Sequence, residues 1–161
     1  MQPNSTVWPL LFSFRGPVMG QGFLAVVELR GRLLARQTED GIILDGVNPG
    51  GFSCQAPTLD LANLDLRGTL LEILADVAFE APTFDAFRQE VTRFFEETDA
   101  ESVDEWQAAV DALRAARLAE PPEPLPRWPA ELALEVRVIE KDLAGVAPTD
   151  NAGRPTLAAA A

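Results

Sequence analysis

The chain has 161 residues, of which 47% are hydrophobic and 24% are charged, a composition typical of one globular domain and unlike that of a disordered chain or a membrane protein. It contains no histidine and only one cysteine, which excludes Ser-His and Cys-His nucleophiles, an intramolecular disulfide and a cysteine-cluster zinc site. The formal net charge of −12 disfavours binding to nucleic acid, and we expect neither enzymatic activity nor a cofactor or metal.

The first third of the sequence alternates between apolar and polar residues, as antiparallel strands do. In residues 8–15 every second side chain is apolar, and Gly16-Pro17 predicts the turn that follows. Residues 23–30 repeat this pattern, with one face that is wholly apolar. Gly31 then predicts either a bulge or a tight turn before the next strand.

Two glycine-containing segments predict where the sheet changes direction. Asp40-Gly41 lies between apolar runs and is a signal for a hairpin into residues 42–45. The segment 46–51, GVNPGG, must end or bend the sheet sharply. Pro49 in that segment cannot donate a ladder hydrogen bond, and Gly50-Gly51 can adopt a positive φ.

Helical periodicity occupies the middle of the chain. Thr58 is placed to cap a helix in which apolar residues recur every three or four positions as far as Ala81. Thr83 can cap a second helix, whose phenylalanine-bearing face we expect to be core. The sequence from Ser102 to Glu105 is a capping box and predicts the start of a third helix. These last two helices form a helical extension over residues 83–119.

The last part of the chain divides into a connector, a strand and a tail. Five prolines make residues 120–130 an extended connector, in which we expect Trp128 to be anchored on the body of the domain. Residues 131–140 alternate as a half-buried late strand, and residues 144–161 lack any period and predict a flexible tail. We therefore expect one α+β domain over residues 1–143, with a mainly antiparallel sheet, helices packed on one face of it and a late C-terminal strand.

The negative charge is concentrated in one block. Residues 1–56 are neutral, whereas residues 57–120 carry fifteen acids and five arginines, a net charge of −10. One interpretation is that these acids lie on solvated helix faces that keep the protein soluble. The other is that they form a surface that steers and docks a basic protein partner.

The order of turns and caps resembles that of the HicB-like antitoxin module over about residues 33–80. The resemblance is carried by Glu39-Asp40-Gly41, by Pro49-Gly50, and by Thr58 followed by Leu59 and Ala62. It implies a reduced ribonuclease-H-like sheet with a helix packed on it, and a protein that neutralises a small basic RNA-cleaving toxin by contact. It implies binding and not catalysis. The C-terminal DNA-binding module that is common in this family has no counterpart here.

Three sets of residues are candidates for sites of chemistry. Glu28, Asp45 and Asp76 are candidates for a two-metal nuclease site, but nothing in the sequence makes them converge. The GVNPGG segment is a candidate anion cradle that lacks the lysine of a phosphate-binding loop, so we expect a structural bend. Cys54 has no neighbouring basic residue to activate its thiol, so we expect it to be buried and inert.

The sequence favours a HicB-like, non-catalytic binding protein that engages a basic protein partner, with no catalytic, cofactor or metal residues assigned. The alternative is a self-associating structural or accessory protein of the same fold, without a toxin. We also expect an oligomer, built through the phenylalanine-bearing helix or the late strand, which either rejoins its own sheet as an edge or pairs with a second copy. The first residues lack the features of a signal peptide, and no apolar run is long enough to span a bilayer, so we expect a cytoplasmic protein without membrane contact.

Overall fold

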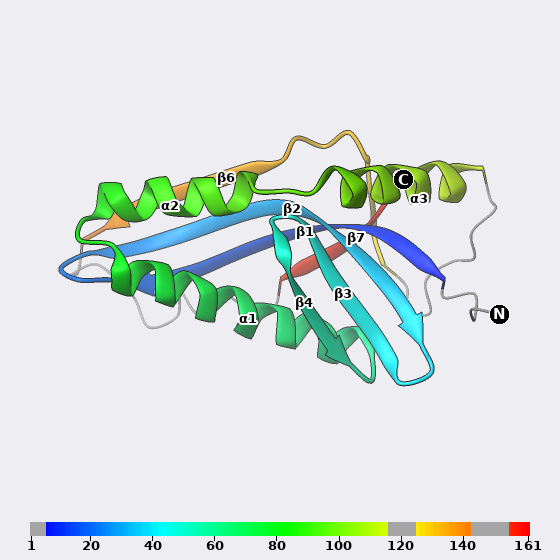
Figure 1. Ribbon diagram of the computed structural model, residues 1–161, viewed down its shortest axis with the longest axis horizontal. Coiled ribbons are helices and arrows are strands. Elements are labelled where there is room, and N and C mark those ends of the chain that lie inside the picture. The colour runs from blue at the N-terminus through cyan, green and yellow to red at the C-terminus, as the bar shows by residue number, and fades with distance from the viewer. Residues whose placement is uncertain (1–5, 116–124, 143–154) are drawn as a thin grey trace.

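The computed structural model describes residues 6–115, 125–142 and 155–161, and it confirms an α+β fold with a mostly antiparallel sheet (Figure 1). Within these residues the sheet has seven strands and is accompanied by three helices. In chain order the elements are β1 (Val7–Met19), β2 (Leu24–Thr38), β3 (Gly41–Asn48), β4 (Gly50–Ala56), α1 (Leu59–Glu80), α2 (Phe84–Glu96), α3 (Ala100–Arg114), β5 (Arg127–Trp128), β6 (Glu135–Lys141) and β7 (Thr156–Ala160).

Strand β2 organises the sheet. Along one side it pairs with β1 over its whole length, and on the other side it pairs first with β6 and then with β3. The strand order is β4-β3-β2-β1-β7-β5, and only the short contact between β5 and β7 is parallel. The change of partner from β6 to β3 falls at Gly31, where an added Cβ would lie 1.9 Å from the backbone oxygen of Asn48. A side chain at this position would push the neighbouring strand away.

The turn predicted at Gly16-Pro17 is wrong, because β1 continues through both residues to Met19 and pairs with β2 there. The chain does not turn at Gly31 either, because β2 continues to Thr38, but the pairing with β3 shifts register next to it, between Arg32 and Leu33. The turns predicted at Asp40-Gly41 and in GVNPGG are confirmed. Strands β2 and β3 are joined through Asp40 and Gly41, and Gly41 has a φ of 136°, which a side chain would strain. A Cβ on Gly41 would also lie 2.2 Å from the oxygen of Ala56. The segment around Pro49 makes the tight turn between β3 and β4, as expected from GVNPGG.

Helices α1 and α2 begin where the sequence predicts and cover one face of the sheet. The hydroxyl groups of Thr58 and Thr83 accept hydrogen bonds from the amides of Leu61 and Ala86. The buried faces of both helices join the even-numbered side chains of β1 in the main core, and Phe87 lies 5.3 Å from Phe23 between ring centroids. Buried helix residues in this core are Leu59, Ala62, Leu66, Leu70, Leu74, Ala78, Phe87, Val91 and Phe95.

The expectation that all helices pack on one face is wrong for α3. Its Trp106 and Val110 pack against Leu11 and Leu34, which point to the opposite side of the sheet from the main core. The Trp106 indole, 1% exposed, donates a hydrogen bond of 3.1 Å to the backbone oxygen of Leu10. The sheet therefore separates two cores, a large one under α1 and α2 and a smaller one under α3.

The N-terminus of α3 also differs from the expected capping box. The helix begins at Ala100, and the side chain of Asp99 accepts hydrogen bonds from the amides of Glu101 and Ser102. The Ser102 hydroxyl donates to the same Asp99 carboxylate at 3.0 Å instead of capping the helix itself. Aspartate is as strong an N-cap as serine, and here it lies one turn earlier in the chain.

The C-terminal elements depart most from the sequence prediction. The late strand is confirmed as β6, but it begins at Glu135 and pairs with β2 of its own chain. The expected flexible tail is wrong for Thr156–Ala160, which form β7 between β1 and β5. Trp128 in β5 packs against the smaller core, as its expected anchoring requires. Two segments lie outside the described part of the chain. Residues 116–124 include the end of the predicted helical extension and the start of the connector, and residues 143–154 include most of the predicted tail.

Candidate functional site

The three acids considered for a metal site do not come together. Glu28 on β2 is paired with Arg15 and Arg137, each at 3.2 Å, and Asp45 on β3 is paired with Arg36 at 3.1 Å. Asp76 lies on the exposed side of α1. Within the described residues no group of three or more acids or cysteines is arranged to hold a metal ion.

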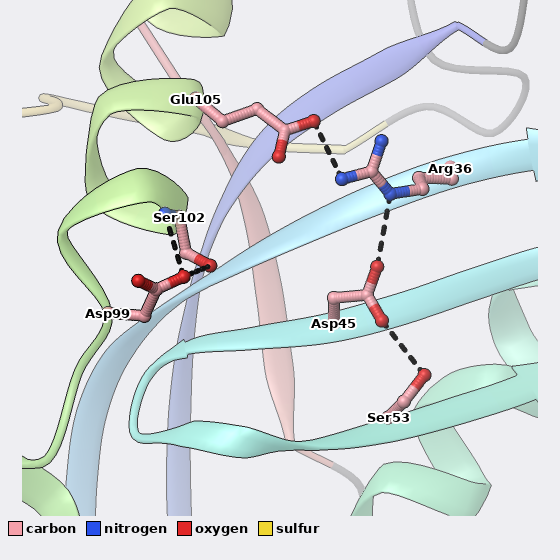
Figure 2. Close-up of polar contacts among 6 residues, drawn as sticks. All are labelled: Arg36, Asp45, Ser53, Asp99, Ser102 and Glu105. Atoms are coloured by element: carbon pink, nitrogen blue, oxygen red, sulfur yellow. Dashed lines mark hydrogen bonds and ion pairs between the residues drawn. The ribbon is translucent and has the colours of Figure 1, made fainter.

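Asp45 instead belongs to a polar network that fastens α3 to the sheet (Figure 2). Arg36 on β2 donates to Asp45 on β3 and, at 2.6 Å, to Glu105 on α3. Ser53 on β4 completes the chain of contacts by donating to Asp45 at 2.9 Å. Burial disfavours the charged guanidinium, but its hydrogen bonds to Glu105 and Asp45 prevail and raise the pKa of Arg36. Each of the four side chains of this network has a partner within the chain, and the network joins three strands and one helix, so its role is structural.

The other two candidate sites, Cys54 and the GVNPGG turn, also take part in the packing and hydrogen bonding of the fold. Cys54 is 3% exposed, and burial raises the pKa of its thiol, which agrees with an inert side chain. In the GVNPGG turn the amide of Gly50 donates to the backbone oxygen of Glu97, and Thr98 donates to the oxygen of Val47. The turn thus docks the α2–α3 junction, and its Gly50 amide is not available to an anion.

A shallow hollow of about 290 Å³ lies on the α3 side of the sheet, beside the strands β1, β2 and β6. Its walls include Arg15, Arg30 and Arg137, which are paired with Glu28 and Glu135 at distances between 3.2 and 3.7 Å. Because the carboxylates already neutralise most of the guanidinium charge, the hollow holds little net charge for an anion.

The outer face of α1 is the most unusual surface of the described chain. We use this name for the side of the helix that carries Leu61, Leu64, Gly68, Ala75 and Phe79, all of them exposed. Leu61 and Leu64 are each 45% exposed and Phe79 is 75% exposed, although α1 buries a complete apolar stripe on its opposite side. A helix with apolar residues on both sides normally has both sides covered.

Acidic residues border this apolar stripe. Asp65, Glu72, Asp76 and Glu80 are all exposed, and α1 as a whole carries five acids and one arginine. None of these four acids forms an ion pair with another residue in the described part of the chain, whereas Asp85 and Glu90 on α2 and Glu105 on α3 are each paired with an arginine. The charge of this face is therefore uncompensated, and it lies beside apolar side chains that gain from being covered.

Sequence reasoning found the acidic block but missed the apolar stripe. The buried face predicted for α1 is largely confirmed. The prediction did not say where Leu61, Leu64 and Phe79 lie. The signal was present, because these three residues are apolar at positions that the buried face does not use.

Comparisons of the chain with models of protein families, with curated proteins and with solved structures found no match. In the part of the chain that is described, no helix has the length and apolar character needed to cross a membrane.

Proposed function

We propose that this chain is a non-catalytic binding protein that engages a basic protein partner through the outer face of α1. The observation that carries the proposal is the pairing of exposed apolar residues with unpaired acids on one helix. Covering Leu61, Leu64 and Phe79 supplies the hydrophobic part of the binding free energy. The four acids beside them attract a cationic partner and reject an anionic one.

The finer form of the proposal is an antitoxin of the HicB-like kind that binds a small RNA-cleaving toxin. It is supported by the sequence resemblance over residues 33–80, which includes the whole of α1. A protein that cleaves RNA needs cationic groups where it contacts the phosphate backbone. An acidic surface that covers such groups competes with RNA, so binding alone is sufficient for inhibition.

Self-association of a structural protein is the second candidate, because the apolar stripe can also be covered by another copy. Two features make it less favourable. In a two-fold dimer through this face, the unpaired acids of both copies lie close together, and their repulsion opposes association. Strand β6, which was a candidate for intermolecular pairing, has its partner in β2 of the same chain.

The proposal is tested by co-expressing the chain with any small basic protein encoded in the neighbouring reading frame and measuring the affinity by calorimetry. Phe79→Ala and the double change Glu72→Gln, Asp76→Asn are each expected to weaken binding about ten-fold or more, as for anchor residues of an interface. Asp104→Asn, which removes an exposed acid on α3, serves as the control. Equal affinities for all of these variants would overturn the proposal.

Light scattering of the isolated chain separates the two candidates. A monomer at micromolar concentration that forms a complex with the basic neighbour supports the binding protein. A dimer that is disrupted by Phe79→Ala, in the absence of any basic neighbour, supports self-association instead.

A further inference from the structure

The exposed residues on the outer face of α1 are spaced as the contact side of a packed helix. Leu61, Gly68 and Ala75 are seven residues apart, and Leu64 falls three residues after the first of them. From Leu61 to Phe79 this stripe extends over about 27 Å at 1.5 Å per residue. Apolar positions at three-, four- and seven-residue intervals are typical of surfaces that receive another helix lengthwise.

The backbone chemistry of this surface also selects a helix. The amide and carbonyl groups of α1 are hydrogen-bonded within the helix. The side of α1 therefore has no unpaired backbone groups with which an extended peptide could form strand-like hydrogen bonds. An extended segment placed here would leave its own backbone groups without protein partners, whereas a helix satisfies them internally.

Gly68 lies at the centre of the stripe. A glycine inside a helix is unfavourable relative to alanine, yet a Cβ at this position would meet no atom within 4 Å. The packing of the described residues therefore gives no reason for a glycine here. A missing side chain does matter to a second helix, because small residues let two helix axes approach to about 8 Å instead of about 10 Å.

We propose that the outer face of α1 receives an amphipathic, basic helix of the partner, packed along α1 with its closest approach at Gly68. This inference rests on the proposed function and specifies how the partner is bound. Asp65 and Glu72 are seven residues apart, and each follows an apolar contact position by four residues. They match lysine or arginine side chains at one heptad spacing on the partner helix.

The probes are synthetic peptides of about 20 residues, long enough to span the stripe. One places leucines at heptad contact positions and lysines beside them, a second has the same composition in scrambled order, and a third replaces each lysine by glutamate. Binding to the full chain is followed by fluorescence anisotropy. We expect the patterned basic peptide to bind at least about ten-fold more tightly than the scrambled peptide, and helicity to increase on binding.

Gly68→Leu is the decisive variant. It improves helix propensity, and its Cβ would meet no atom of the described residues within 4 Å, so the thermal midpoint is expected to stay the same or rise. Its affinity for the patterned peptide is expected to fall about ten-fold, because the added side chain separates the two helices. Gly68→Ala gives a smaller loss should the larger residue disturb folding. Ala108→Leu, at an exposed position of α3, is the matched control and keeps the original affinity.

Three results overturn the inference. The first is that the Gly68→Leu variant binds the patterned peptide as tightly as the original chain does. The second is that the original chain does not bind this peptide at concentrations below about 1 mM. The third is that the patterned and scrambled basic peptides bind equally tightly. This result would still support a basic partner, but it would show that the partner does not bind as an amphipathic helix. Binding of the glutamate peptide as tightly as the lysine peptide would instead overturn the proposed function itself.

Discussion

Replacement of Leu157 by alanine tests the burial of the C-terminal strand. Leu157 is 6% exposed and belongs to the main core, and it pairs with Phe12 of β1. Truncation of a buried leucine costs about 2–4 kcal/mol through lost burial and the cavity that remains. With a urea m-value of about 2 kcal/mol/M, the unfolding midpoint should fall by roughly 1–2 M.

The assay is urea unfolding followed by far-UV circular dichroism, with Thr156→Ala as the control. Thr156 is exposed on the same strand, so its replacement should change the free energy of unfolding by less than about 1 kcal/mol. A flexible tail predicts no effect from either change. If Leu157→Ala alters the free energy of unfolding by less than about 0.5 kcal/mol, the placement of β7 in the sheet is refuted.

Four further outcomes are expected. Trp106→Phe should lower the free energy of unfolding by about 1–3 kcal/mol, measured by circular dichroism in urea, because the buried oxygen of Leu10 loses its donor; an unchanged midpoint would contradict this. A double-mutant cycle with Arg36→Met and Glu105→Gln should give a coupling of about 0.5–1 kcal/mol, and additive effects would count against the network in Figure 2. The pKa of Cys54 is raised above its ordinary value of 9.0, so the unfolded chain loses the thiol proton first and stability should fall as the pH rises above that value. A thiol reagent at pH 8 should label Cys54 only as fast as the chain opens, and labelling as fast as in urea would show that the thiol is accessible.

Local chemistry accounts for the features that the sequence predicts well. The caps at Thr58 and Thr83 and the hairpin at Asp40-Gly41 each depend on residues within four positions of one another. Such signals can be found in a single sequence, because the partner group lies in the same short segment. The cap predicted at Ser102 is wrong because Asp99, three residues earlier, can also cap this helix, and only the folded chain shows which residue does.

Features that depend on distant segments were not predicted. The run from Leu157 to Ala160 has no period and little β propensity, and it is a strand because β1 and β5 lie on either side of it. The sequence of α3 likewise does not predict which side of the sheet the helix packs against. This side follows from apolar residues such as Leu11 and Leu34 on the second face of β1 and β2.

The candidate site likewise combines a feature that the sequence predicts with features that depend on distant segments. The charge of the block 57–120 could be counted directly, whereas the exposure of Leu61, Leu64 and Phe79 depends on which side of α1 faces the sheet. A helix that is apolar on two sides does not fix that choice by its own pattern. The open surface at Gly68 could be recognised only once neighbouring elements were placed around it.

The pairing of β6 and β7 has a consequence for the speed of folding. Arg30 pairs with Glu135 and Ser13 pairs with Thr156, so both strands join partners that are more than 100 positions away in the chain. Contacts between such distant residues form slowly, because a long loop must close before they contribute. The hairpin of β1 and β2 therefore forms early, while the outer edge of β1 and the first half of the outer edge of β2 are still unpaired. During refolding these edges are templates for intermolecular pairing, so the yield of native protein should fall as the chain concentration rises.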